Sequence, residues 1–331
     1  MKTVSLWVSV IVNLLMLNVS ISPLFAKAPT TPKILFTSAP QGNYEVFIMN
    51  TDGSEKVNLT QHPANDQQAV WSPSGDQILF VSDRNDDMED LYLMNADGSN
   101  VRRVFKGIRK TNKSSPTWSP DGKQIAYGAI DWNSSVSTIY IATLGEEKEK
   151  EFVIGGTDPA WSPDGTEIAC IIDEHLTFVN LRTRERKQFL PKKAIQWPHL
   201  PSWSATGDRL AFSGNNNPFP AVQDRQQHNE WMDEHTIFIA NRDGTGFQQI
   251  VDEAGPLAWS PELSPDGEKI LYTQAIKGPH QIFKIDVHSG IQTPLTDKIW
   301  SFGGDWFDPM YALSVSPEPH LLTTTWGMVK K

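Results

Sequence analysis

The sequence predicts an all-β protein, a six-bladed β-propeller of four-stranded antiparallel blades. The first observation is a five-residue motif, Trp-Ser-Pro-Asp-Gly, which recurs exactly or nearly so at five places along the chain. The copies begin at residues 71, 118, 161, 203 and 263, so they are separated by 47, 43, 42 and 60 residues. A repeat period in the low forties indicates a repeat architecture and takes precedence over any local interpretation.

The second observation is that every copy is followed by the same two apolar runs. Both runs are short, rich in β-branched and aromatic residues and bounded by turn residues, which is typical of strands and not of helices. The first runs are QILFVS (77–82), QIAYGA (124–129), EIACII (167–172), RLAFSG (209–214) and KILYTQ (269–274). The second runs are DLYLMN (90–95), STIYIA (137–142), LTFVNL (176–181), TIFIAN (236–241) and QIFKID (281–286). A turn rich in Asp, Asn and Gly and a short last strand complete each unit.

The motif itself predicts a tight turn between the first two strands of each blade. Proline sets φ for the second turn position, Asp can bond its own backbone, and Gly accepts a positive φ. The tryptophan ends the preceding strand and offers a large packing surface. Stacking four-stranded blades radially then buries faces that no blade could bury alone.

The third observation concerns the two ends of the repeat array. ILFTS (34–38), EVFIMN (45–50) and KVNLT (56–60) match the later strands of a unit, but no Trp-Ser-Pro precedes them. Trp306 comes 43 residues after Leu263, with no complete unit behind it. We therefore expect the C-terminal strand near Trp306 to complete the first blade, which gives six blades and a ring without open edges.

The flanking segments predict an exported protein. Residues 1–28 have a charged start, an apolar middle and an Ala-x-Ala end, the layout of a signal peptide. The alternative is an uncleaved anchor, which Asn13, Asn18 and Pro23 disfavour. The propeller is expected over 33–310 and a C-terminal tail over 311–331. That tail either docks on the propeller, serves as a recognition tag, or is a frayed terminus.

Composition narrows the classes of partner. The net charge of the whole chain is −10, and removal of a leader holding two lysines and no acid lowers it to −12. An acidic protein repels phosphate backbones and anionic lipid surfaces, so nucleic acid is excluded as the expected partner. The single cysteine, Cys170, lies in the apolar run IACII and is expected to be a core residue. We expect a periplasmic or secreted monomer with no stable membrane insertion after signal cleavage.

The repeats also resemble a known family. WSPDGxxIAF followed by IYxMNxDG is similar to the TolB-like (PD40, WD40-like) six-bladed propeller repeats, over about residues 33–310. The resemblance implies the propeller fold and binding to other proteins of the cell envelope. TolB carries an α/β domain before its propeller, whereas here the leader runs almost directly into the first repeat. We therefore expect a TolB-like propeller without that domain.

Propeller geometry indicates where function should lie. The repeated turns share one face, and the variable loops share the other, which is where binding residues tend to gather. The longest insertion, residues 214–235, is on that variable-loop face. We expect it to fold over the channel opening as a lid, with Trp231 near the ring axis. The candidate partner-binding residues are His62, Trp132, Trp197, His199, Phe219, His228, Trp231, His235, His280 and Trp300.

The same face offers an alternative, enzymatic interpretation. HNEWMDEH (228–235) could hold a divalent metal such as Ca or Mn through His228 and His235, but it matches no tight metal motif and also fits a solvated loop. The acidic run SDRNDDMED (82–90) could bind Ca²⁺ but lacks the full EF-hand pattern and is expected to be a polar hairpin loop. No nucleophile elbow or P-loop is present.

The expected function is therefore a scaffold that binds an envelope protein or peptide, with no catalytic residues and no cofactor. The alternative is a carbohydrate-active lyase or hydrolase that uses His199, His228 and His235, with Trp197 and Trp231 stacked on sugar rings. Oligogalacturonate lyases, whose repeats are similar, use histidines and a metal on one face. No motif of theirs can be placed in this chain residue by residue.

Overall fold

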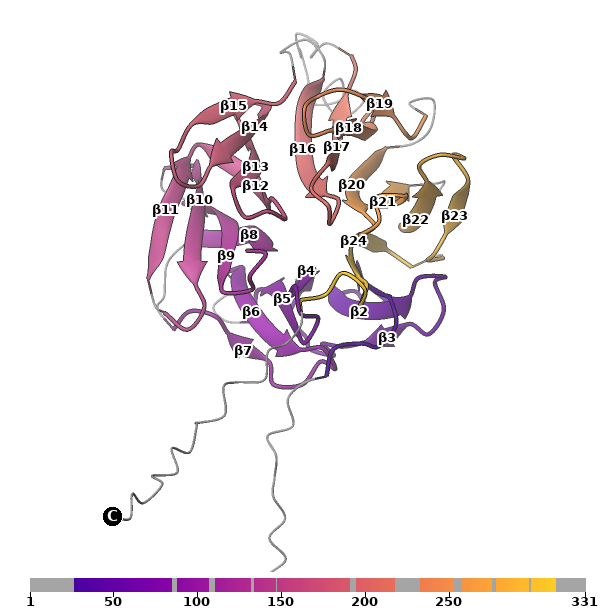
Figure 1. Ribbon diagram of the computed structural model, residues 1–331. Helices are drawn as coiled ribbons and strands as arrows, with labels where there is room; N and C mark the ends of the chain where they lie inside the picture. Colours follow the sequence, from indigo (N-terminus) through magenta and orange to yellow (C-terminus); the bar gives the residue numbers. More distant parts are fainter. Residues whose placement is uncertain are drawn as a thin grey trace, which may run out of the picture.

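The computed structural model confirms a six-bladed β-propeller, with the blades arranged radially around a central channel (Figure 1). Each blade is a four-stranded antiparallel sheet. The structure describes residues 27–84, 88–106, 111–131, 134–146, 148–190, 195–217, 233–252, 257–275, 278–297 and 299–313. Within these residues every regular element is a strand.

The strands follow the predicted runs closely. Blade 1 contains β24 (Ser301–Phe307), β1 (Lys33–Ser38), β2 (Glu45–Asn50) and β3 (Val57–Asn58), and blade 2 contains β4 (Asp66–Trp71), β5 (Gln77–Ser82), β6 (Asp90–Asn95) and β7 (Arg102–Arg103). Blade 3 contains β8 (Thr111–Trp118), β9 (Gln124–Asp131), β10 (Val136–Thr143) and β11 (Glu149–Ile154), and blade 4 contains β12 (Gly156–Trp161), β13 (Glu167–Ile172), β14 (His175–Asn180) and β15 (Arg186–Gln188). Blade 5 contains β16 (Gln196–Trp203), β17 (Arg209–Asn215), β18 (Thr236–Asn241) and β19 (Gln248–Gln249), and blade 6 contains β20 (Ala258–Leu263), β21 (Lys269–Ala275), β22 (His280–Asp286) and β23 (Gln292–Pro294).

The ring closes as the two ends of the repeat array predict. The last strand, β24, pairs with the first, β1, and places Trp306 opposite Ile34. In Figure 1 the yellow end of the chain accordingly lies beside the indigo first blade. Residues from the far end of the sequence thus form the inner strand of blade 1, so that β1 has no unpaired edge.

The repeated turns have the predicted chemistry. In Ser119-Pro120-Asp121-Gly122 the glycine has φ +70°, its N–H bonds the Ser119 carbonyl, and Asp121 accepts the Ser119 hydroxyl at 2.6 Å. Two copies lack Asp at the third turn position. There the Asp that follows the glycine takes over: Asp76 accepts from Ser72 at 3.0 Å, and Asp208 accepts from Ser204 at 2.8 Å.

Apolar side chains pack between neighbouring blades. Trp71 of blade 2 contacts Phe307 of blade 1, with ring centroids 5.3 Å apart, and both belong to one buried cluster. Cys170 is fully buried, and burial raises the pKa of its thiol to about 12, so it is the core residue that the sequence predicts.

The two flanking segments lie mostly outside the described residues. The expected signal peptide (1–28) is described only from Lys27, and the tail (311–331) only to Leu313. The Leu313 N–H donates to the carbonyl of Pro73, on the face of the repeated turns. Among the described residues there is no helix long and apolar enough to cross a membrane.

Candidate functional site

Two sets of loops form the variable-loop face. One set joins the middle strands of each blade, and the other joins one blade to the next. Backbone hydrogen bonds connect the two sets: the Asp66 N–H donates to Tyr44 at 2.8 Å, Ala258 to His235 at 2.9 Å, and Ala39 to Trp300 at 2.9 Å. These bonds hold the starts of β4 and β20 against a loop of the preceding blade, and the end of β1 against the start of β24.

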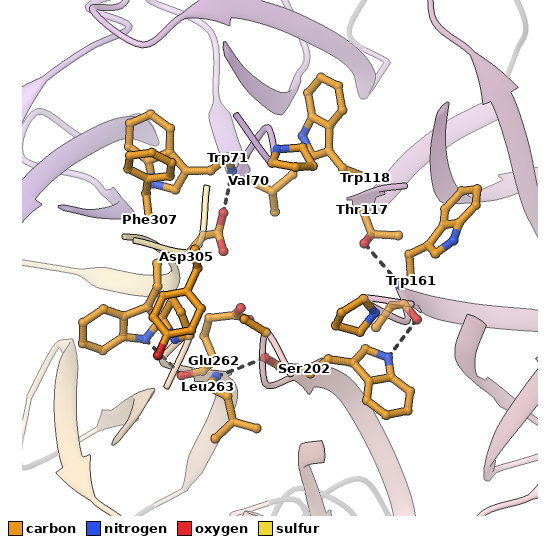
Figure 2. Close-up of a pocket in the computed structure, with 18 of the residues that line it drawn as sticks. Val70, Trp71, Thr117, Trp118, Trp161, Ser202, Glu262, Leu263, Asp305 and Phe307 are labelled. Carbon is orange, nitrogen blue, oxygen red and sulfur yellow. Dashed lines mark hydrogen bonds between the residues drawn. The ribbon is translucent and has the colours of Figure 1, made fainter. Parts of the chain in front are cut away.

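The channel contains two hollows that meet inside the ring. The hollow of about 190 Å³ opens toward the variable-loop face, and the other, of about 330 Å³, opens toward the face of the repeated turns. Figure 2 shows the side chains that line a hollow around the open centre of the ring. Five residues line both hollows: Val70, Pro116, Pro159, Pro201 and Glu262.

Each inner strand has the same β-bulge where it faces the channel. The residue three places before the motif's first position has a positive φ in all six blades, and the cross-strand register shifts there. These left-handed residues are Gln68, Ser115, Asp158, Leu200, Ser260 and Gly303, with φ between 48° and 65°. The next residue in each strand forms an apolar collar around the hollow: Ala69, Pro116, Pro159, Pro201, Pro261 and Gly304.

A third ring lies just beyond this collar. It contains the residue immediately before the motif position in each blade: Val70, Thr117, Ala160, Ser202, Glu262 and Asp305. Every second member accepts a hydrogen bond from a backbone N–H of the next blade. Asp305 accepts from Trp71 at 2.5 Å, Thr117 from Trp161 at 3.3 Å, and Ser202 from Leu263 at 3.0 Å.

The other three members of this ring are Val70, Ala160 and Glu262. Val70 and Ala160 have no side-chain acceptor, so the propeller forms its blade contacts there without a polar group. Glu262 nevertheless places a carboxyl in the channel beside Asp305, as Figure 2 shows. The contacts between blades therefore do not require an acidic side chain at this position.

The environment of the two acids is unusual. Both remain partly open to the channel, yet each is surrounded by protein. Burial and the neighbouring charge of Asp305 raise the pKa of Glu262 well above its usual value, and burial raises the pKa of Asp305 to about 7. The two carboxyls hydrogen-bond to each other, and Ser202 hydrogen-bonds to Glu262. Such a pair favours holding a proton between its members until a cation or a rise in pH replaces that proton.

An aromatic strip lies at one side of the channel mouth. It runs through Tyr44, Phe302, Trp259, His280 and Trp300, with successive ring centroids 5.0, 5.9, 5.8 and 4.3 Å apart. Phe302 and Trp259 line the hollow of about 190 Å³ that opens toward the variable-loop face. Trp300, at the end of the strip, is 49% exposed. Burial lowers the pKa of His280, so at neutral pH the strip carries no cationic imidazole.

Comparison with known proteins identifies the repeat. Residues 9–114 match the family model for the TolB beta propeller domain (PD40). Over these residues the chain is similar to the TolB-like propellers. An uncharacterized protein of Agrobacterium fabrum is 38% identical over 103 residues, which are 28% of this chain and 35% of that protein. The Tol-Pal system protein TolB of Geobacter sulfurreducens is 31% identical over 80 residues, 24% of this chain and 18% of that one. The matches thus span about a third or less of these relatives.

Solved structures show how widely this fold is used. TolB from Acinetobacter baumannii superposes with a TM-score of 0.68 at 16% identity, over 83% of this chain and 66% of the other. An oligogalacturonate lyase from Vibrio parahaemolyticus superposes with a TM-score of 0.54 at 12% identity, over 82% of this chain and 76% of the other. At these identities both structures show the fold alone.

The propeller brings several of the predicted site residues together in two groups. His280 and Trp300 are neighbours in the aromatic strip. His199, within β16, and His235, at the end of the long insertion, have ring centroids 5.0 Å apart. Trp197 is adjacent to this second pair, because its carbonyl lies 3.0 Å from His199 Nδ1.

His62 joins neither of these groups. Its Nδ1 accepts the Ala64 N–H at 3.1 Å, and its own N–H donates to Glu45. It therefore stabilises the loop from blade 1 to blade 2. Four other predicted residues lie outside the described residues: Trp132, Phe219, His228 and Trp231. The predicted lid lies outside them too, since residues 218–232 of the insertion are not described.

The acidic run 82–90 is described except for residues 85–87. Its described acids have separate protein partners. Asp83 accepts from Asn65, Glu89 from Gln67, and Asp90 from both Arg103 and Lys113. Within the described part of the chain, no three His, Cys, Asp or Glu side chains are grouped as they would be around a metal ion.

The sequence analysis missed Glu262, Asp305, Trp259 and Tyr44. The two acids were detectable, because they are adjacent in the ring and occupy the position just before the motif in two consecutive repeats. At that position the other four repeats have Val70, Thr117, Ala160 and Ser202, so the two acids stand out. Trp259 was obscured by its own context, because Trp259-Ser260-Pro261 imitates the motif four residues before the true copy at Leu263.

Proposed function

We propose that this protein is an exported, periplasmic or secreted scaffold that binds a protein or peptide partner at the channel mouth on its variable-loop face. The aromatic strip from Tyr44 to Trp300 is the observation that carries the proposal. Aromatic side chains bury a large area at a small cost in conformational entropy and are enriched at the energetic centres of interfaces. The protein names of the TolB relatives support a role in the envelope.

The position of the strip supports an interface and not a core function. Its inner members, Phe302 and Trp259, form one wall of a hollow of about 190 Å³. Its outer member, Trp300, is 49% exposed, and the adjacent Ile299 is 44% exposed. An apolar surface that continues from a hollow to an exposed rim is typical of a site that a partner covers.

A pull-down from envelope extract with matched variants tests this function. Trp300→Ala removes the exposed end of the strip, and Ile291→Ala removes an apolar side chain that is 67% exposed on the opposite face. We expect partners captured by the wild type to be reduced severalfold with Trp300→Ala and unchanged with Ile291→Ala. Capture that is equal for all three proteins would contradict the proposed face.

A second candidate, a carbohydrate-active lyase or hydrolase, has one observation in its favour. The rings of His199 and His235 lie together beside the long insertion, and His235 is 1% exposed. Neutral imidazoles suit several transition metals, and a third ligand would have to come from beyond the described residues. Metal analysis of the purified protein, together with His199→Ala and His235→Ala, tests it. Metal-free protein whose variants keep any measured activity would remove this candidate.

A further inference from the structure

The channel lining separates apolar and acidic surface into two layers. Going inward from the variable-loop face, a ligand first meets the collar, of which four members are prolines. It then meets the ring that contains Glu262 and Asp305. The described residues that line the two hollows include four acids, Asp158, Glu262, Asp305 and Asp308, and no Lys, Arg or His. The lining of the channel is therefore complementary to a positively charged group, and it would repel an anion.

The two sides of the mouth differ in how firmly they are braced. On the side of blades 2 to 4, the Ser115 N–H donates to Gln68 Oε1 at 2.6 Å, and the Ser115 hydroxyl donates to Asp158 at 3.0 Å. On the side of blades 5, 6 and 1, the equivalent positions are Leu200, Ser260 and Gly303. The aromatic residues Trp259 and Phe302 stand on this second side. An entering segment thus meets small and apolar groups beside an aromatic wall.

Glu262 carries a carboxyl that the packing of the blades does not require. The two other ring members that accept no bond from the next blade are Val70 and Ala160, so blade packing tolerates an apolar side chain at this position. A carboxyl there is desolvated at a free-energy cost, as its raised pKa reflects. A buried charge is normally offset by a partner of opposite charge.

We propose that the channel receives one long basic side chain from a peptide segment of a partner protein. The aliphatic stem passes the proline collar, and the ammonium or guanidinium group pairs with Glu262 and Asp305. Residues flanking the basic one lie against Trp259 and Phe302. Lysine and arginine fit this arrangement because each carries its charge at the end of a flexible apolar stem. The inference rests on the proposed function and specifies the chemistry of its partner.

A random heptapeptide phage-display library, selected on the immobilised full chain at pH 8, tests the proposal. We expect selected peptides to be enriched in Lys or Arg at one position next to an aromatic residue or proline. Selection on Glu262→Gln should weaken that enrichment, because the variant keeps the shape of the side chain and removes one of the two carboxyls that would pair with the basic group. Glu268→Gln, the same substitution on the face of the repeated turns, should keep it. Melting temperatures confirm that both variants are folded.

One selected peptide then gives the quantitative test. It is synthesised with its lysine or arginine and again with norleucine, which keeps an apolar stem and removes the charge. We expect the norleucine form to bind the wild type about 10-fold more weakly or worse. On Glu262→Gln the ratio between the two forms should be severalfold smaller than on the wild type, because only Asp305 then remains to pair with the charge, and the change in that ratio measures the direct contribution of Glu262.

The failures of the two proposals are distinguishable. Peptides that bind but show no basic enrichment, or a lysine-to-norleucine ratio that Glu262→Gln leaves unchanged, would overturn the basic-side-chain proposal. If such peptides still lost binding with Trp300→Ala, the proposed binding face would stand. Failure to select any binding peptide would also overturn the inference, whereas the pull-down result would still decide the proposed function.

Discussion

Asp305 accepts a hydrogen bond from the backbone N–H of Trp71, a residue 234 positions earlier in the chain. The bond joins the last strand, β24, to the inner strand of blade 2, next to the place where the ring closes. The same carboxyl hydrogen-bonds to Glu262 of blade 6. One side chain thus contacts both neighbours of the closing blade and connects the stability of the ring to the chemistry of the channel.

Removing the Asp305 acceptor should weaken the ring. We expect Asp305→Ala to unfold at a lower urea concentration than Asp305→Asn, because asparagine keeps an oxygen for the Trp71 N–H and alanine leaves that donor unpaired. The difference in the free energy of unfolding should be about 1–3 kcal/mol. Equal urea midpoints for the two variants would show that this bond contributes nothing to closure.

Truncation tests the closing strand as a whole. A chain ending at residue 300 lacks β24 and leaves β1 with an unpaired edge, whereas a chain ending at residue 313 keeps the β24–β1 ladder. We expect the shorter chain to lose far more than the roughly 1 kcal/mol typical of a point substitution. Thermal unfolding of both chains measures the loss. The closure would be refuted by matching melting temperatures.

Glu262 and Asp305 should make stability depend on pH. Both have pKa values raised in the folded protein, so their contribution is fully present below their unfolded pKa values and is lost as pH rises through the folded ones, near 7 for Asp305. The melting temperature should therefore fall more between pH 5 and pH 8 for the wild type than for Glu262→Gln, by about 2 °C or more.

One control variant and one background effect apply to this pH experiment. Glu185→Gln removes an exposed acid from the turn between β14 and β15, on the opposite face, and should behave as the wild type does. The lowered pKa of His280 acts in the opposite direction, since it favours folding as pH rises, but it is common to all three proteins and cancels in the comparison. Parallel curves for the wild type and Glu262→Gln would contradict the assignment.

Two turn glycines with similar φ differ in the space beside them. Gly75 and Gly122 have φ of +73° and +70°, so alanine at either position is strained by about 1–2 kcal/mol. At Gly75 an added Cβ would also lie 2.2 Å from the Phe307 ring, whereas at Gly122 the nearest atom, in Pro73, is 3.8 Å away. Gly75→Ala should therefore cost more stability than Gly122→Ala in urea unfolding. The reverse order would show that Phe307 moves aside without cost.

Cys170 should not react in the folded protein. Its side chain is fully buried, and burial raises the pKa of its thiol to about 12, so the reactive thiolate is scarce and inaccessible. We expect a thiol reagent such as dithiobis-nitrobenzoate to label Cys170 only at the rate of unfolding and quickly in denaturant. Rapid labelling without denaturant would contradict its place in the core.

The sequence was sufficient to predict the fold because each repeat carries the local signals of a complete blade. The Ser-Pro-Asp-Gly turn and the two apolar runs define the blade locally, and the unmatched ends define the closure. The candidate site was harder, because its parts come from different repeats. Tyr44 is far from Trp259, His280 and Trp300 in the chain and joins them through Phe302 only when the ring closes. Glu262 looks like any surface acid until the channel surrounds it.

The histidines show the same limit from the other direction. His62 was selected by its place on the variable-loop face, but its ring bonds a backbone N–H two residues away. Such a local role leaves no mark in composition or spacing. His280 and Trp300 were selected by the same argument, and they do lie together. Loop position therefore predicted which face to examine and did not predict which side chains on it would meet.

The six β-bulges have a consequence for how such a molecule can change. The left-handed residue and the collar residue after it fall where the cross-strand register shifts, so they lie outside the regular pairing that holds a blade together. The side chains of the collar residues should therefore tolerate exchange with less effect on the ladders, or on the turns of the opposite face, than side chains within the paired stretches. The collar residues thus line the channel without belonging to the regular strand pairing of the blades. Changing the six aligned positions of the collar would therefore alter the surface that lines the channel and leave the blades in place.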